Sequence, residues 1–220
     1  MLSITQFDLS YPGYPPLARV TWHLKPGEQV ALLGRSGTGK STLLKAILHA
    51  ANHPHIEIET DRIAYLAQQP VLLPWLTVAE NVSLGNRLRG ESVTPADAEQ
   101  IEQRLTDVGL AGFGPRTIDT LSGGQRARVA LARVLFEKAD CVLLDEPFSG
   151  LDRSTRIDMA SLCRELLLEQ TVVLVTHDPL DARNWLSHAM VLTETSLTGP
   201  FELTQFENDR VLLDALGVGL

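Results

Sequence analysis

Cysteine and long apolar runs are scarce in this sequence. Only two of its 220 residues are cysteine, Cys141 and Cys163, and their wide separation matches no metal-binding or redox spacing. We therefore expect two buried, reduced thiols. Glycine, proline or charged residues interrupt every hydrophobic stretch before it reaches the length of a membrane span, and residues 1–13 lack the basic start and apolar stretch of a signal peptide. These absences predict a cytoplasmic protein without direct membrane insertion, which meets a membrane only through a partner.

Positive charge is also in short supply. The formal net charge is -8 and the isoelectric point is about 5.2, whereas proteins that grip phosphate backbones usually present a basic face. This balance argues against a nucleic-acid partner. The 44% hydrophobic and 21% charged shares are ordinary for a globular protein. A chain of this length can form one α/β domain with a smaller lobe attached.

Apolar runs bounded by glycine or proline predict buried strands, and their alternation with helical patterns predicts an α/β fold with a parallel sheet. Thr77 with Glu80 gives a capping-box pattern, and Thr94 followed by Pro95 gives a second helix start. The stretch from about residue 71 to residue 138 predicts an inserted helical lobe. The expected strands cover residues 2–9, 18–24, 28–34, 56–59, 62–68, 139–147, 171–178 and 188–194. The expected helices cover residues 39–51, 77–88, 94–110, 123–139, 161–170 and 181–187.

A glycine-rich loop lies between the third expected strand and the first expected helix, and it fits the pattern G-x-x-x-x-G-K-[ST]. Glycines let such a backbone curl so that successive N–H groups point at phosphate oxygens, and the following helix adds positive potential. Lys40 supplies a full positive charge to the β- and γ-phosphates, and the Ser41 hydroxyl can ligate Mg²⁺. The loop therefore predicts a nucleotide site. Its residues are Gly34, Arg35, Ser36, Gly37, Thr38, Gly39, Lys40, Ser41 and Thr42.

Two adjacent carboxylates end the apolar strand that begins at Cys141. In a protein with a phosphate loop, Asp145 is suited to hold Mg²⁺ through its waters, because hard cations prefer oxygen ligands. Glu146 would then face the γ-phosphate and could orient or deprotonate the attacking water.

A second anion cradle occurs at the start of another helix, with the sequence LSGGQ. Glycines there expose backbone N–H groups, Ser122 adds a hydroxyl, and the helix dipole adds positive potential. Two different cradles, only one with a lysine, suggest that two copies of the chain share nucleotides. The cradle consists of Leu121, Ser122, Gly123, Gly124 and Gln125.

These motifs together resemble the ABC ATPase family over essentially the full length. GRSGTGKST resembles the family's Walker A motif, VLLDE its Walker B, LSGGQ its signature, and SGLD, ending at Asp152, its D-loop. Gln68 resembles the Q-loop glutamine and His177 the switch histidine, and Tyr11 stands where the family has an aromatic residue that stacks on adenine. The resemblance implies a P-loop NTPase (RecA-like) core from residues 1–70 and 138–220, with an antiparallel β subdomain and a helical subdomain over residues 71–137.

The resemblance also implies a reaction and its partners. ATP and Mg²⁺ are the expected cofactors, with Glu146 as general base, His177 at the γ-phosphate and Gln68 as a further Mg²⁺ ligand that senses the nucleotide. Two chains would form a head-to-tail, ATP-dependent homodimer in which Lys40 of one chain and Ser122 of the other hold each nucleotide. The expected partners are integral-membrane permease subunits and a solute-binding protein, with the chain on the inner face of the cell membrane.

Some residues admit two interpretations. Tyr14 rivals Tyr11 as the base-stacking residue, and Gln69 stands beside Gln68. An apolar group around Pro74, comprising Leu72, Leu73, Trp75 and Leu76, either packs the helical lobe or receives a short helix of a membrane subunit. The spacing of His49 and His53 could bind zinc, but beyond His55 no third ligand is evident, so we expect a solvated connection.

Three functions of an ABC-type ATPase compete on the sequence alone, while the LSGGQ segment disfavours a fourth, a P-loop small-molecule kinase. The first is the energy-coupling subunit of an importer of a small solute, since LLPWLTVAENV resembles the nitrate, sulfonate and taurine branch and the thiamine-type importers. The second is an exporter ATPase, which would share every catalytic motif. The third is an ABC ATPase that acts on nucleic acid, which the acidic charge disfavours. The transported molecule contacts other subunits, so this chain does not reveal it.

Overall fold

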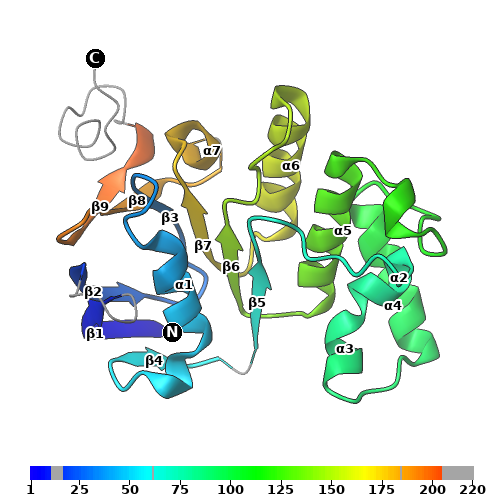
Figure 1. The fold of residues 1–220 in the computed structure, drawn as a ribbon, viewed down its shortest axis with the longest axis horizontal. Helices are drawn as coiled ribbons and strands as arrows, with labels where there is room; N and C mark the ends of the chain where they lie inside the picture. The colour runs from blue at the N-terminus through cyan, green and yellow to red at the C-terminus, as the bar shows by residue number, and fades with distance from the viewer. Residues whose placement is uncertain (11–16, 61, 184, 205–220) are drawn as a thin grey trace.

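A computed structural model describes residues 1–10, 17–60, 62–183 and 185–204. Two sheets and a group of helices make up the fold, as Figure 1 shows. The larger sheet has six strands in the order β5-β6-β7-β3-β8-β9, and the smaller has three in the order β2-β1-β4. The predicted α/β class is confirmed.

The six-stranded sheet is parallel except at one edge, where β9 pairs with β8 in the antiparallel direction. Strands β6 and β7 are buried along their whole length, which explains why they appear in the sequence as continuous apolar runs. The six strands are β3 (Gln29–Leu33), β5 (Ile63–Leu66), β6 (Cys141–Asp145), β7 (Thr171–Thr176), β8 (His188–Leu192) and β9 (Leu197–Glu202).

The register of the parallel strands brings four loops to one edge of this sheet. Leu66 of β5 lies opposite Leu144 of β6, and Asp145 of β6 lies opposite Val175 of β7. Strand β3 ends beside the last residue of β7. The segments that follow β3, β5, β6 and β7 therefore emerge side by side at the carboxyl edge, where open α/β sheets bind their ligands.

The smaller sheet packs beside the core and is antiparallel. Along β2 buried and exposed residues alternate strictly, as expected for a sheet with one face on the core and one in water. Its strands are β1 (Leu2–Leu9), β2 (Ala18–Leu24) and β4 (Ile56–Ile58). The strands predicted over residues 2–9, 18–24 and 56–59 are thereby confirmed.

The helices flank the large sheet and, on the right of Figure 1, form a separate lobe of α2, α3 and α4 beside α5. Both predicted helix starts are confirmed: Thr77 caps α2 with Glu80, and Thr94 caps α4 with Pro95 in the first turn. The helices are α1 (Lys40–Leu48), α2 (Val78–Val82), α3 (Leu84–Leu88), α4 (Pro95–Asp107), α5 (Gly123–Phe136), α6 (Arg153–Leu166) and α7 (Pro179–Arg183), with short 3₁₀ turns over Ala50–Asn52 and Ile118–Thr120.

The structure corrects the bounds of several predicted helices. The helix predicted over 161–170 is α6, which begins earlier, at Arg153, and ends at Leu166, and the helices predicted over 94–110 and 123–139 end at Asp107 and Phe136. The helix predicted over 39–51 ends at Leu48, and the helix predicted over 77–88 divides at Ser83, whose hydroxyl donates to the carbonyl of Ala79. The helix predicted over 181–187 is α7, which begins and ends earlier. The sequence interpretation also missed β9; as an edge strand, β9 tolerates Pro200, which has no N–H to donate.

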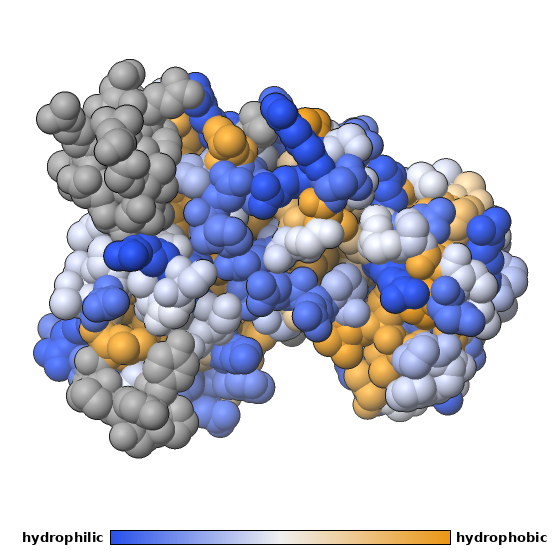
Figure 2. All heavy atoms as spheres, turned by 45° about the horizontal axis from the view of Figure 1, so that its top comes forward, coloured by the Kyte–Doolittle hydropathy of each residue, from blue (hydrophilic) through white to orange (hydrophobic). Residues whose placement is uncertain are grey.

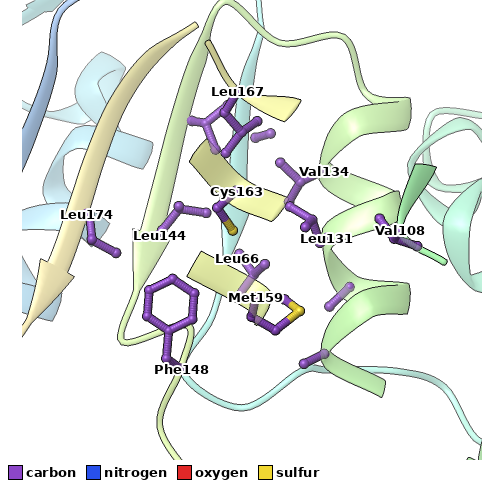
Figure 3. Packing of buried hydrophobic residues seen from close by; sticks show 14 of the residues in the cluster. Leu66, Val108, Leu131, Val134, Leu144, Phe148, Met159, Cys163, Leu167 and Leu174 are labelled. Carbon is purple, nitrogen blue, oxygen red and sulfur yellow. The ribbon is translucent and has the colours of Figure 1, made fainter. Parts of the chain in front are cut away.

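Two apolar clusters cover the two faces of the large sheet. Figure 3 shows the cluster in which Phe148 packs with Leu144 and Leu66 of the sheet and with Met159 of α6, and in which Leu131 of α5 carries the core toward the helical lobe. Because this cluster is continuous, the sheet, α6 and the lobe share one core.

Both cysteines are free and buried, as predicted. Burial raises the pKa of the Cys141 thiol to about 11 and that of Cys163 to about 12. No helix among the described residues is long and apolar enough to cross a membrane.

Candidate nucleotide site

The glycine-rich loop joins β3 to α1 and wraps around the amine of Lys40. The ammonium Nζ donates to the carbonyl oxygens of Gly34 (2.8 Å) and Arg35 (2.9 Å). Gly39 caps the helix in the left-handed conformation, with φ of 96°, which glycine adopts without a steric cost. A Cβ at Gly39 would also lie 2.9 Å from Cδ2 of Leu9. The loop is therefore held curled, with the lysine at its centre.

The other residues of the loop divide by exposure. Thr38 is buried, and its hydroxyl donates to the carbonyl of Arg35 at 2.9 Å, which closes the turn. The exposed residues Arg35, Ser36 and Gly37 face solvent, and Thr42 lies half-buried in the first turn of α1.

Lys40 is almost completely buried, with 5% of its surface exposed. Desolvation lowers the pKa of its ammonium below the ordinary value, and the charges of Glu146 and Asp145 act in the opposite direction. A cation held in this way offers a strong, directed charge to an anion that replaces water in the loop.

Asp145 receives hydrogen bonds on both of its carboxylate oxygens. Ser41 Oγ donates to Oδ1 at 2.9 Å, and the phenol of Tyr65 donates to Oδ2 at 3.1 Å. Burial, aided by the charge of Asp145, raises the pKa of Tyr65 to about 12, so the phenol stays protonated and keeps its donor. The two residues expected to serve Mg²⁺, Ser41 and Asp145, thus lie in direct contact.

Glu146 directly follows β6. Its backbone φ is 46°, a value that residues other than glycine rarely adopt. Three contacts hold this turn: the Glu146 N–H donates to the carbonyl of Val175, its carbonyl accepts from Ser149 N–H, and Phe148 is buried two residues later. Strain of this kind persists only where the surroundings impose it, and it concentrates at functional sites.

Gln68 and His177 approach Glu146 from the two neighbouring strands. Gln68 Nε2 donates to Oε2 of Glu146 at 3.1 Å, and His177 Nδ1 lies 3.2 Å from Oε1. Sheet register explains the convergence, because Gln68 follows β5 and His177 follows β7 on either side of β6. The structure therefore brings together the three residues that were predicted to be catalytic.

Residues of the glycine-rich loop, together with Gln68 and Glu146, line a cavity of about 240 Å³. Its lining residues are Ser36, Gly37, Gly39, Lys40, Ser41, Gln68 and Glu146. A larger hollow of about 630 Å³ lies at the opposite ends of β6 and β7, beside Cys141 and Thr171, far from the phosphate loop along the strands. The small cavity combines a buried cation and a glycine-rich wall, which suit a phosphate group, with a carboxylate that could act on a water molecule beside it.

The LSGGQ segment lies elsewhere: among the described residues that line the small cavity, none comes from residues 121–125. Leu121 is buried, whereas Ser122 and Gly123 are exposed at the start of α5. Ser122 Oγ accepts from Gln125 N–H at 3.3 Å, and Gln125 Oε1 accepts from Ser122 N–H at 3.0 Å. This reciprocal capping box, which the sequence interpretation missed although the pattern S-x-x-Q signals it, fixes the exposed backbone N–H groups in place.

Asp152 is the N-cap of α6, and its carboxylate accepts hydrogen bonds from the backbone N–H groups of Ser154 and Thr155. Hydrogen bonds from the Ser154 and Thr155 side chains hold the pKa of Asp152 well below its usual range. Like the LSGGQ segment, Asp152 is absent from the described lining of the small cavity. Tyr11 and its rival Tyr14 lie outside the residues that the structure describes.

The residues of the apolar group around Pro74 differ in exposure, so that some pack on the core and others face solvent. Leu76 is buried and Leu72 packs on the core, whereas Trp75 is 75% exposed and Val71 is 65% exposed. The histidine connection has no metal-binding geometry, since the described residues contain no group of three His, Cys, Asp or Glu side chains that could hold an ion. Instead, His53 packs edge-on against Phe7.

The sequence interpretation missed three residues that support these motifs. Tyr65 donates a hydrogen bond to Asp145 on the neighbouring strand. Arg133 of α5 binds Val71 and Asn81, which follow Gln68 in the chain. The methyl group of Thr155 packs against Gly124. Sheet order and helix packing create these contacts, so no local sequence pattern could have revealed them.

Comparison with known proteins agrees with this site. Residues 17–149 match the ABC transporter family. The chain is 41% identical over 184 residues to an aliphatic sulfonates import ATP-binding protein of Rhodococcus jostii, covering 80% of this chain and 72% of the relative. It is 38% identical over 184 residues to a thiamine import ATP-binding protein of Haemophilus influenzae, covering 77% and 85% of the two chains.

A solved structure shares the fold. The ATP-binding cassette MJ0796, solved as a dimer in a post-hydrolysis state with ADP and Pi, superimposes with a TM-score of 0.77 at 28% identity, covering 92% of this chain and 99% of that one. The family match spans more than half of the chain and includes the phosphate loop, the LSGGQ segment and Glu146. This chain therefore belongs to the ABC transporter family, as an ATP-binding subunit that hydrolyses ATP.

Proposed function

We propose that this chain powers the import of a small solute, as one of two ATPase subunits attached to a membrane permease. The observation that carries the proposal is the convergence of Gln68 and His177 on Glu146 beside the buried ammonium of Lys40. A base, its orienting partners and a phosphate-binding cation are the parts that phosphoryl transfer to water needs.

In the proposed reaction Lys40 binds the β- and γ-phosphates of ATP, and Glu146 takes a proton from a water molecule. The water oxygen bonds to the γ-phosphorus while the bond to the ADP oxygen breaks, which gives ADP and phosphate. His177 holds the γ-phosphate and orients the water. Gln68 and His177 each engage one oxygen of Glu146 in the structure, which orients the carboxylate and leaves each oxygen a further lone pair to accept a proton from the water.

The donor set also fits Mg²⁺. Ser41, Asp145 and the side-chain oxygen of Gln68 are hard oxygen ligands of the kind that Mg²⁺ takes together with phosphate oxygens. The contact between Ser41 and Asp145 supports the fit, because it brings a hydroxyl and a carboxylate to one point beside the phosphate loop. The ion would neutralise charge on the phosphates.

Two copies would complete each nucleotide site. The exposed N–H groups at the start of α5 have no role in the cavity of their own chain, and a second subunit turned head to tail can present them to the γ-phosphate held by Lys40. Ser122, Gly124 and Asp152 would lie at this interface. The dimeric state of the related cassette supports this arrangement. The base-stacking role proposed for Tyr11 completes the nucleotide contacts.

The direction of transport rests on the relatives, two of which are named as import ATP-binding proteins for sulfonates and for thiamine. A permease contact is supported by apolar surface over the helical lobe, at the right of Figure 2, and by the exposed side chains of Val71 and Trp75. On this proposal residues 71–137 form a helical subdomain that links the nucleotide to the permease at the inner face of the membrane. A solute-binding protein would deliver the cargo to the permease at the opposite face.

Light scattering of Glu146→Gln with and without Mg-ATP tests the shared site. We expect this variant to bind ATP, to lose turnover by about 10²- to 10⁴-fold, and to shift from monomer to dimer when ATP is added. Turnover at the wild-type rate would remove Glu146 as the base. A mass that stays monomeric at saturating ATP would contradict the head-to-tail dimer for the isolated subunit.

A further inference from the structure

Thr155, in the first turn of α6, touches two of the segments discussed above at once. Its hydroxyl donates to Oδ2 of Asp152 at 2.6 Å, and its backbone N–H donates to Oδ1 of the same carboxylate at 3.1 Å. Its methyl group faces α5: a Cβ added to Gly124 would lie 2.8 Å from Thr155 Cγ2. Real Cβ atoms are essentially never found so close to another heavy atom. The two helices can therefore approach each other here only because Gly124 has no side chain.

This contact is stiff. Threonine is β-branched and has few allowed χ1 rotamers, and a rotation that removed the methyl group from Gly124 would also remove the hydroxyl from Asp152. The neighbouring packing adds to the rigidity, because Ala127 of α5 and Met159 of α6 are buried in one cluster. Displacing either the start of α5 or Asp152 must therefore disturb the other.

Gly123 provides the internal comparison. Nothing lies within 4 Å of a Cβ placed on that residue. Gly123 therefore has room for a side chain, whereas Gly124 does not. Gly124 is also not among the residues with positive φ, so its backbone would accept alanine. Glycine is thus required at position 124 because Thr155 of the same chain occupies the space that a side chain would need.

We propose that Thr155 is a positioning residue that couples the D-loop carboxylate Asp152 to the LSGGQ backbone within one subunit, through its hydroxyl on one side and its methyl group on the other. The proposal rests on the shared-site dimer of the proposed function, in which both segments face the partner subunit. It makes Thr155 the mechanical link by which a contact made at one segment sets the position of the other.

A double-mutant cycle tests this coupling, with ATP-dependent dimerisation in the Glu146→Gln background as the readout. Gly124→Ala should weaken dimerisation at least tenfold. Thr155→Ser, which keeps the hydroxyl and removes the methyl group, should by itself weaken dimerisation several-fold, and it should restore most of the affinity when it is combined with Gly124→Ala, whose methyl group fills the vacated space. Thr155→Val, which keeps the methyl group and replaces the hydroxyl by a second methyl, should weaken dimerisation several-fold and leave the ATP affinity of the monomer unchanged.

Ser154→Ala supplies the matched control. Ser154 also donates to Asp152, at 2.6 Å, but Gly124 has Thr155 as its closest neighbour. The effects of Ser154→Ala and Gly124→Ala should therefore add. If Gly124→Ala were equally damaging with and without Thr155→Ser, the glycine would serve ligand approach alone and the coupling would be overturned.

Amide hydrogen exchange of the nucleotide-free chain separates this proposal from the dimer on which it rests. Thr155→Ala should raise exchange at residues 122–126 if Thr155 holds the start of α5, whether or not the chain dimerises. A Glu146→Gln parent that stays monomeric would contradict the shared site, and the exchange result would still decide the contact. Unchanged exchange in that segment would overturn the role of Thr155.

Discussion

The guanidinium of Arg133 on α5 binds Asn81 at two atoms, with Nε 2.8 Å from the backbone carbonyl and Nη2 3.1 Å from Oδ1. Its third nitrogen donates to the carbonyl of Val71 at 2.9 Å. Asn81 is fully buried, and its side chain bonds in turn to both the N–H and the carbonyl of Leu73. The segment that follows Gln68 is therefore tied to the helix that begins with the LSGGQ residues.

Replacing Arg133 by lysine should break this tie. A lysine amine cannot reproduce the planar fork that reaches three acceptors, and hydrogen bonds made by a charged group contribute about 1.5–3 kcal/mol. We expect Arg133→Lys to lower the free energy of unfolding by about 2 kcal/mol, measured by urea titration, and to raise amide exchange at Leu73. Arg126→Lys, on an exposed position of the same helix, should change neither; an equal effect of both variants would contradict the tie.

Local chemistry made much of the fold predictable. The Thr77 and Thr94 caps marked two helix starts because their side chains accept from N–H groups three residues along the chain. The apolar runs at β6 and β7 marked strands buried on both faces. Strand order was not predictable, since nothing within the β3 sequence specifies that it lies between β7 and β8.

The site follows the same division. Lys40, Asp145 and Glu146 stand in motifs whose chemistry can be deduced from residue type and spacing. The positive φ of Glu146 could not be deduced, because the backbone there is imposed by Val175 on the next strand and by buried Phe148. The base-stacking prediction for Tyr11 remains a prediction, as that residue lies outside the described ranges.

The two thiols should be inert in the folded chain. Burial raises the pKa of Cys141 to about 11 and that of Cys163 to about 12, so at pH 8 about one thiol in a thousand or fewer is a thiolate, the reactive form. We expect no reaction with an aromatic disulfide reagent at pH 8 under native conditions, and two equivalents after denaturation. Rapid native labelling of either cysteine would show that its segment opens or packs differently.

Lys40 and Lys45 offer a matched pair for nucleotide binding. Lys40 is buried in the phosphate loop, whereas Lys45, one turn further along α1, is exposed. Loss of a charge-assisted hydrogen bond costs about 1.5–3 kcal/mol, so Lys40→Ala should weaken ATP binding by about 10- to 100-fold in a fluorescent-nucleotide titration. Lys45→Ala should stay within about twofold. ATP affinity that is unchanged in Lys40→Ala would count against the assigned loop.

Tyr65 should lower the Mg²⁺ concentration that ATP hydrolysis requires. Its phenol donates to Oδ2 of Asp145 while Ser41 donates to Oδ1, so the carboxylate is oriented from both sides. Phenylalanine at Tyr65 keeps the ring packing and removes only the donor, which frees the carboxylate to rotate. We expect Tyr65→Phe to raise the Mg²⁺ concentration that gives half-maximal ATPase activity by about 10-fold or more, since a hydrogen bond to a carboxylate contributes about 1.5–3 kcal/mol.

The same variant should bind ATP in the presence of a chelator as tightly as the wild type, because Lys40 and the loop are untouched. Its free energy of unfolding should fall by no more than the lost hydrogen bond explains, about 1.5–3 kcal/mol, because the ring still fills its place beside β6. Equal Mg²⁺ dependence of Tyr65→Phe and the wild type would show that Ser41 alone suffices to orient Asp145. A parallel loss of chelator-resistant ATP binding would instead mean that Tyr65 supports the phosphate loop, and the assignment to the carboxylate would fall.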